Sequence, residues 1–208
     1  MRTRAELKAM AKEQIKGNLG PLFVISLIVF GITYVASLLL SLIAFGNLIV
    51  SVVITPAFSL STVYIYLALV NFGQKPQAAD AFKGFNDFFT AFKTTFLTTL
   101  FTFLWSLLFI IPGIIKGYSY AMAMYVVAEN PGISALEAID RSKEMMEGHK
   151  MELFVLYLSF FGWSLLTVIT FGIAGIWTIP YMTATMANFY NEIKPQTSFY
   201  SEAAPEQF

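Results

Sequence analysis

The stretch that decides the fold is residues 22–70, LFVISLIVFGITYVASLLLSLIAF, then GN, then LIVSVVITPAFSLSTVYIYLALV. It contains no Asp, Glu, Lys or Arg, and each apolar run is long enough to cross a hydrocarbon core of about 30 Å. Only Gly46 and Asn47 separate the two runs, so the stretch predicts two transmembrane helices joined as a tight hairpin. The apolar part of a secretory signal peptide is only about 7–15 residues long, so we expect the first run to be an uncleaved transmembrane helix.

Further apolar stretches follow this hairpin. The expected spans are residues 22–45, 48–70, 94–111, 113–128, 154–173 and 176–190. As a single helix, residues 94–128 would be about 52 Å long, which is too long for one span. Pro112 and Gly113 interrupt this run, and proline removes a helical hydrogen bond and clashes with the preceding turn. We therefore expect a turn or hinge at Pro112 and Gly113.

Positive charge is distributed unevenly between the expected loops. Twelve Lys and Arg residues fall on one side, and only Lys116 falls on the other. The twelve are Arg2, Arg4, Lys8, Lys12, Lys16, Lys75, Lys83, Lys93, Arg141, Lys143, Lys150 and Lys194. Because cytoplasmic segments carry the excess of Lys and Arg, we expect both termini in the cytoplasm. A five-span alternative would move the last four of the twelve outside and reduce the bias, so six spans are favoured.

A short amphipathic segment precedes each expected hairpin, within residues 4–16, 78–93 and 134–147. In the third segment, Ser134 and Glu137 have the spacing of a capping box, and Ile139 lies on the apolar face. Such segments suit the membrane interface. The sequence thus predicts an all-α polytopic membrane protein: six transmembrane helices arranged as three hairpins, with short interfacial amphipathic helices. Residues 1–208 would form a single membrane domain, ending in a disordered cytoplasmic tail over residues 191–208.

Composition excludes several classes of site. Charged residues make up 12% of the chain and the mean hydropathy is +0.66, whereas soluble domains carry about twice that charge. The formal net charge is zero, which gives no reason to expect nucleic acid as a partner. The chain has no cysteine and a single histidine, His149, so thiolate sites and cages of several histidines are excluded. We expect no catalytic, cofactor-binding or metal-binding residues, and no cofactor.

The candidate contact residues lie in the loop before the fifth expected span. They are Arg141, Lys143, His149 and Lys150, and they would touch lipid head groups or a protein partner. Glu147 and His149 could form an acid–base pair, but a solvated charged face is favoured because no nucleophile accompanies them. The hydroxyls of the third expected span could line a polar seam, or they could bond to their own helix backbone, which is the more usual arrangement.

Several motifs resemble a bacterial family of integral membrane proteins known as domain of unknown function 975. They are IPGI (residues 111–114), YAM (120–122) with Tyr125, AENP (128–131), Arg141-Ser142, MEGHK (146–150), LSFFGW (158–163), IPY (179–181) and ANFY (187–190). The N-terminal RAELK (4–8) and KGN (16–18) are also similar. The resemblance implies a polytopic plasma-membrane protein and implies no activity.

The expected function is a non-enzymatic structural or interaction protein of the bacterial plasma membrane. Its partners would be membrane lipids or another membrane or cytoplasmic protein. The alternative is a transporter or permease-like component for peptides or amphiphiles. In its favour, WSLL occurs at both residues 105–108 and 163–166, either by chance or as the trace of an internal repeat, and repeats in transporters often flank a binding site. A lipid-modifying membrane enzyme is a third class.

Overall fold

Every regular element that the structure describes is a helix. The computed structural model describes residues 2–43 and 46–195, apart from the side chain of Ile49, and these residues contain no strand. The elements are α1 (Arg4–Ile15), α2 (Leu19–Leu40), α3 (Gly46–Ile49), the π-helix η1 (Val50–Ile54), α4 (Thr55–Phe72), the 3₁₀-helix η2 (Ala78–Phe85), α5 (Phe88–Leu108), α6 (Ile110–Tyr120), α7 (Ala123–Glu129), α8 (Ala135–Met145), α9 (Lys150–Leu158), α10 (Phe161–Ile169) and α11 (Gly175–Ile193). The all-α prediction is confirmed for this part of the chain. Of the expected tail, residues 191–193 belong to α11 and residues 196–208 lie outside the described residues.

Five helices in the described part of the chain are long and apolar enough to cross a membrane. They are Leu19–Leu40 (α2), Gly46–Phe72 (α3, η1 and α4), Phe88–Leu108 (α5), Ile110–Glu129 (α6 and α7) and Lys150–Ile169 (α9 and α10). The sixth expected span, α11, has 19 residues and carries polar side chains such as Asn188 in its second half, and it is not one of the five. The length and apolar composition of the five helices indicate a membrane protein.

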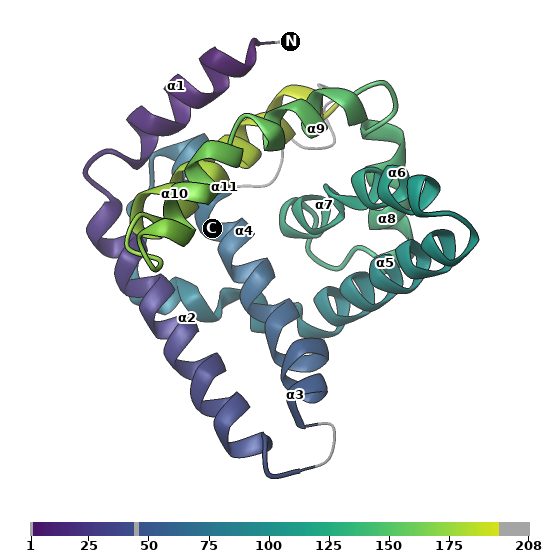
Figure 1. The fold of residues 1–208 in the computed structure, drawn as a ribbon, viewed down its shortest axis with the longest axis horizontal. Coiled ribbons are helices and arrows are strands. Elements are labelled where there is room, and N and C mark those ends of the chain that lie inside the picture. Colours follow the sequence, from purple (N-terminus) through teal and green to yellow (C-terminus); the bar gives the residue numbers. More distant parts are fainter. Residues whose placement is uncertain (1, 44–45, 196–208) are drawn as a thin grey trace.

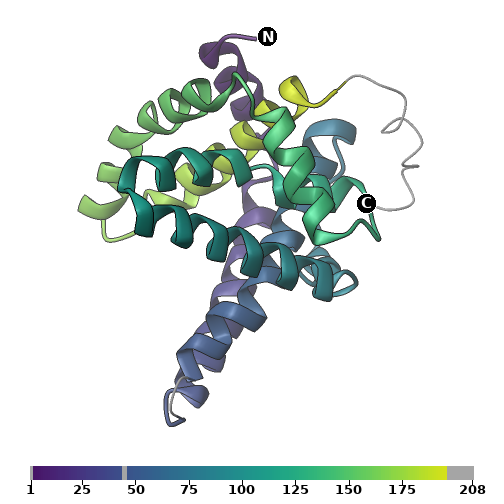
Figure 2. The same ribbon diagram turned by 90° about the vertical axis from the view of Figure 1, so that its right-hand side faces the viewer.

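Three helix pairs project from a common base (Figures 1 and 2). In Figure 1, α2 and α3 meet at the bottom, α5 and α6 meet on the right, and α10 and α11 meet on the left. The joined ends therefore point apart, and most apolar side chains on the pairs are uncovered. In α10 no residue is buried, and in α2 only Leu22 and Ile25 are buried.

The packed core lies at the base, around α4. Most residues from Pro56 to Leu69 of this helix are buried, and α4 contacts η2, α5, α7 and α11. Figure 1 shows α4 running through the middle of the molecule. Gly84 of η2 makes the closest approach to α4: its N–H donates to Ser61 Oγ at 2.8 Å. The short helices thus close the base while the long ones extend from it.

The turn between α5 and α6 lies at Phe109, before the expected position. Phe109 has extended backbone angles (φ −158°, ψ 143°), and Pro112 follows in the first turn of α6, where a missing N–H breaks no helical bond. Gly113 is buried against α5, and an added Cβ would lie 2.0 Å from Ser106 Oγ. Pro112 therefore starts the helix after the turn, and Gly113 lets the two helices approach closely.

The amphipathic helix α8 packs on the protein instead of presenting its apolar face to the membrane interface. Ile139 is 1% exposed and Met146 is fully buried. Ser142 fixes α8 to the break between α6 and α7: its Oγ donates to the Ser119 carbonyl at 2.8 Å and accepts from the Met122 N–H at 3.2 Å. The expected interfacial placement of Ile139 is wrong, because neighbouring helices cover the same apolar stripe that lipid would cover.

Other expected helices are divided. The expected helix over residues 78–93 is the 3₁₀-helix η2 followed by the start of α5. The span expected at residues 113–128 is interrupted between α6 and α7, and that expected at residues 154–173 is interrupted between α9 and α10. No proline lies at either interruption, so the breaks depend on tertiary contacts that local sequence does not reveal.

Candidate functional site: the surroundings of α1

Helix α1 begins with a complete capping box. The Thr3 hydroxyl accepts from the Glu6 N–H, and the Thr3 N–H donates to Glu6 Oε2 at 2.6 Å. The backbone bond, together with the Thr3 hydroxyl bond, lowers the pKa of Glu6. Leu7, Ala11 and Ile15 form a buried stripe at a spacing of one helical turn. The stripe docks α1 against α11, so the helix is part of the packed base.

Polar contacts join α1 to α11 along this seam. Gln14 and Asn188 exchange two side-chain hydrogen bonds, at 2.6 and 3.3 Å. Arg2 forms an ion pair with Glu192 at 3.2 Å. Because amide pairs and ion pairs require specific partners, these contacts position α1 along α11 more precisely than the apolar stripe alone.

Lys8 connects α1 to the break between α9 and α10. Its Nζ donates to the Ser159 carbonyl at 2.9 Å and lies 3.9 Å from the centroid of the buried Phe160 ring. The carbonyl belongs to the C-terminal end of α9, where a cation is favourable. Partial burial, with the nearby Arg4 charge, lowers the pKa of the Lys8 ammonium.

A cavity of about 880 Å³ opens between α1 and the α10–α11 pair. We call it the α1 groove. Its lining is Ala9, Lys12, Glu13, Ile15, Lys16, Leu19, Trp163, Leu166, Thr170, Ile173, Ala174, Trp177 and Tyr181. One wall therefore carries charge, from α1, and the other is mostly apolar and aromatic. Trp163 packs edge-on against Tyr181, with ring centroids 6.2 Å apart.

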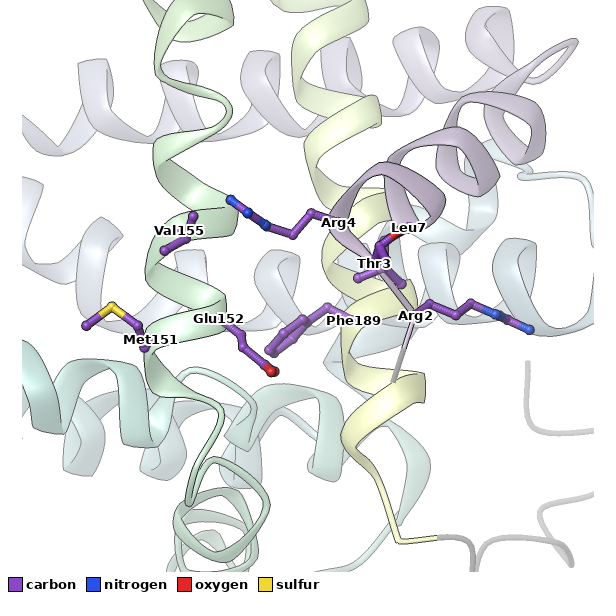
Figure 3. Close-up of a pocket in the computed structure, with 8 residues that line it drawn as sticks. All are labelled: Arg2, Thr3, Arg4, Leu7, Met151, Glu152, Val155 and Phe189. Atoms are coloured by element: carbon purple, nitrogen blue, oxygen red, sulfur yellow. The ribbon is translucent and has the colours of Figure 1, made fainter.

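A smaller cavity of about 360 Å³ lies at the N-terminal end of α1, between α9 and α11 (Figure 3). In Figure 3, Arg4 reaches from α1 toward Val155 of α9, whereas Arg2 points away from it. Glu152 lines the same cavity, and its carboxylate lies 2.8 Å from His149 Nδ1, from which it accepts a hydrogen bond when that nitrogen carries a proton. Within the described residues, no group of three His, Asp, Glu or Cys side chains could hold a metal ion.

The structure does not bring the four candidate contact residues into one site. Arg141 pairs with Glu137 at 2.8 Å and Lys143 with Asp140 at 2.7 Å, both within α8. His149 and Lys150 lie at the start of α9, and His149 faces Glu152 instead of Glu147. The set therefore divides between α8 and the start of α9.

Several hydroxyls of the third and sixth expected spans bond to their own helices, whereas the buried Thr94 hydroxyl has no hydrogen-bond partner among the described residues. Thr98 donates to the Thr94 carbonyl and Ser106 to the Thr102 carbonyl. In α11, Thr185 donates to the Tyr181 carbonyl. The backbone-bonding interpretation is confirmed for Thr98 and Ser106 of the third expected span.

A buried ion pair in the base was not predicted. Glu129, with its side chain 7% exposed, accepts from Lys194 Nζ at 2.6 Å and from the Tyr190 hydroxyl at 2.9 Å. The Tyr190 ring stacks on Tyr125, with centroids 5.2 Å apart. A carboxylate ending the apolar run at residues 121–128 could have signalled this pair, because a buried acid needs a cation or a donor.

A family model described as "Protein of unknown function (DUF975)" matches residues 1–116 and 107–197. This chain belongs to the DUF975 family. Comparison with curated proteins and comparison with solved structures gave no match. The resemblance noted in the motifs is therefore confirmed, and membership of DUF975 carries no biochemical role with it.

Proposed function

We propose that this DUF975 protein is a multi-pass protein of the bacterial plasma membrane that acts without catalysis, through its lipid contacts. Six helices would cross the bilayer as three hairpins, and both termini would lie in the cytoplasm. The base, with α1, η2 and α8, would face the cytoplasm. The protein would have a structural role or would bind a partner in the membrane or the cytoplasm.

The main support for a membrane location is the apolar surface of the three helix pairs. Large apolar side chains are uncovered along them, up to 98% exposed at Phe171. Soluble proteins rarely expose apolar patches larger than a few hundred Å², so lipid is the natural cover. The distribution of Lys and Arg supports the orientation, since twelve of them fall in the expected cytoplasmic segments and only Lys116 falls in an expected outer turn.

Labelling of single cysteines tests the topology. Cysteines replacing Asn47, Phe109 and Phe171, all exposed at joined ends, should react with a membrane-impermeant maleimide in intact cells. Cysteines replacing Gln77 and Glu144, exposed at the base, should react only after permeabilisation. Reaction at Glu144→Cys in intact cells would contradict the six-span arrangement.

The α1 groove is the observation that favours the alternative, a transporter component for amphiphiles, because its volume lies in the range of ligand sites. Movement of fluorescent phospholipids between leaflets of proteoliposomes separates the two functions. The proposed role predicts the same rate as in protein-free vesicles. A rate raised several-fold, and abolished by Ala9→Trp within the groove, would replace it with transport.

A further inference from the structure

We propose that the α1 groove holds one anionic glycerophospholipid, with its phosphate at Lys12 and Lys16 and an acyl chain along α10 and α11. This inference rests on the proposed membrane placement and names the lipid contact through which the protein would act. Its basis is the charge and the apolar surface that meet in this one cavity.

The charged wall can receive a phosphate. Lys12 lies in the last turn of α1, Lys16 directly follows the end of this helix, and both line the groove. Neither lysine forms an ion pair in the part of the chain that the structure describes, unlike Arg2, Lys83, Arg141, Lys143 and Lys194. Glu13 lines the same wall and offsets part of the positive charge. The wall therefore keeps a net positive charge that nothing within the described chain neutralises.

The opposite wall can receive an acyl chain. Leu166, Ile173 and Trp177 supply apolar surface, and α10 has no buried residue, so the groove is continuous with the surface that lipid would cover. Trp163 and Trp177 have apolar rings with one polar N–H, a combination enriched where hydrocarbon meets head groups. Figure 1 shows α1 beside the α10–α11 pair, on the side of the base.

Of the three lysines at positions 8, 12 and 16, only Lys12 and Lys16 would contact the lipid phosphate, because Lys8 is already engaged. Its ammonium already donates to the Ser159 carbonyl and lies over Phe160, and it does not line the groove. Lys8 holds α1 in place, while Lys12 and Lys16 extend past that contact toward the cavity.

Tryptophan quenching by brominated lipid gives a direct test. The chain has three tryptophans, and Trp105→Phe leaves only the two in the groove. In phosphatidylcholine vesicles with a minor fraction of chain-brominated phosphatidylglycerol, quenching should exceed that by the same fraction of brominated phosphatidylcholine. Two lysines partly offset by Glu13 imply a preference of about tenfold for the anionic lipid.

Two variants and a matched control complete the design. In the Trp105→Phe background, Lys12→Gln with Lys16→Gln should abolish the preference, and Ala9→Phe should reduce it by filling the groove without adding a tryptophan. Lys143→Gln with Lys150→Gln removes the same charge at the base, away from the groove, and should retain the preference. Circular dichroism and an unchanged elution volume would show that each variant is folded.

Three outcomes would overturn the inference. Equal quenching by both brominated lipids would show no selective site. An equal loss with both lysine pairs would show general attraction to the surface. No quenching of the groove tryptophans would mean that a protein segment or partner occupies the groove. If cysteine labelling supports the six-span topology but the brominated lipids show no preference, only the lipid site in the groove is wrong. If the labelling contradicts the topology, both the proposed function and the lipid site are rejected.

Discussion

Lys194→Met should lower the free energy of unfolding by about 3 kcal/mol, because it leaves the Glu129 carboxylate buried without its cation. The Glu129 side chain is only 7% exposed, and of its two described donors only the Tyr190 hydroxyl would remain. Lys194 is itself partly exposed, which places the cost near the lower end for buried pairs. Equilibrium unfolding in mixed micelles with increasing denaturing detergent would measure it.

Lys143→Met is the matched control for this effect. Its partner Asp140 has a side chain 66% exposed, so losing that pair should cost less than about 0.5 kcal/mol. Adding Glu129→Gln to Lys194→Met should recover part of the loss, because a neutral amide costs less to bury than a charge. Equal losses in the two lysine variants would show that water reaches Glu129.

Gly84→Ala should destabilise the protein by about 3 kcal/mol or more. An added Cβ would lie 2.1 Å from the Ala57 carbonyl oxygen and 2.6 Å from the Ser61 nitrogen, and both are backbone atoms of the central helix α4. The backbone cannot rotate away as a side chain can, so η2 would separate from α4 and strain the buried bond from the Gly84 N–H to Ser61. Overpacking combined with a weakened buried hydrogen bond accounts for the size of the effect.

Gly31→Ala provides the comparison, in the middle of α2. Nothing lies within 4 Å of a Cβ placed there, and alanine favours helix by up to about 1 kcal/mol over glycine. Its unfolding free energy should therefore equal or slightly exceed that of the parent protein. If Gly84→Ala behaves like Gly31→Ala, the close packing of η2 on α4 is wrong.

Local signals predicted two of the three expected short helices, α1 and α8, whereas residues 78–93 form the 3₁₀-helix η2 and the start of α5. The polar and apolar pattern of residues 4–16 corresponds to α1, and Ser134 caps α8 by accepting from the Glu137 N–H. The Glu137 side chain pairs with Arg141 instead of completing the capping box. Caps and periodicity depend on residues within about one turn, so a sequence carries them in full.

What covers an apolar face could not be predicted. Ile139 has the same helical pattern whether lipid or protein covers it, and only the fold shows that α5, α6 and α7 do. The candidate site escaped prediction for a related reason. Lys12 and Trp163 line opposite walls of one groove but lie far apart in the sequence. No proline marks the interruption between α9 and α10, so the local sequence does not predict where α10 begins.

The seam between α1 and α11 has a consequence for biosynthesis. Gln14 and Asn188 are 174 positions apart, so α1 is synthesised well before its partner α11. Until α11 is in place, the stripe of Leu7, Ala11 and Ile15 lacks its final cover, and an amphipathic helix can wait at the lipid surface. Contacts this distant in sequence form late. A protein cut short before α11 would therefore leave this stripe without the cover that α11 supplies.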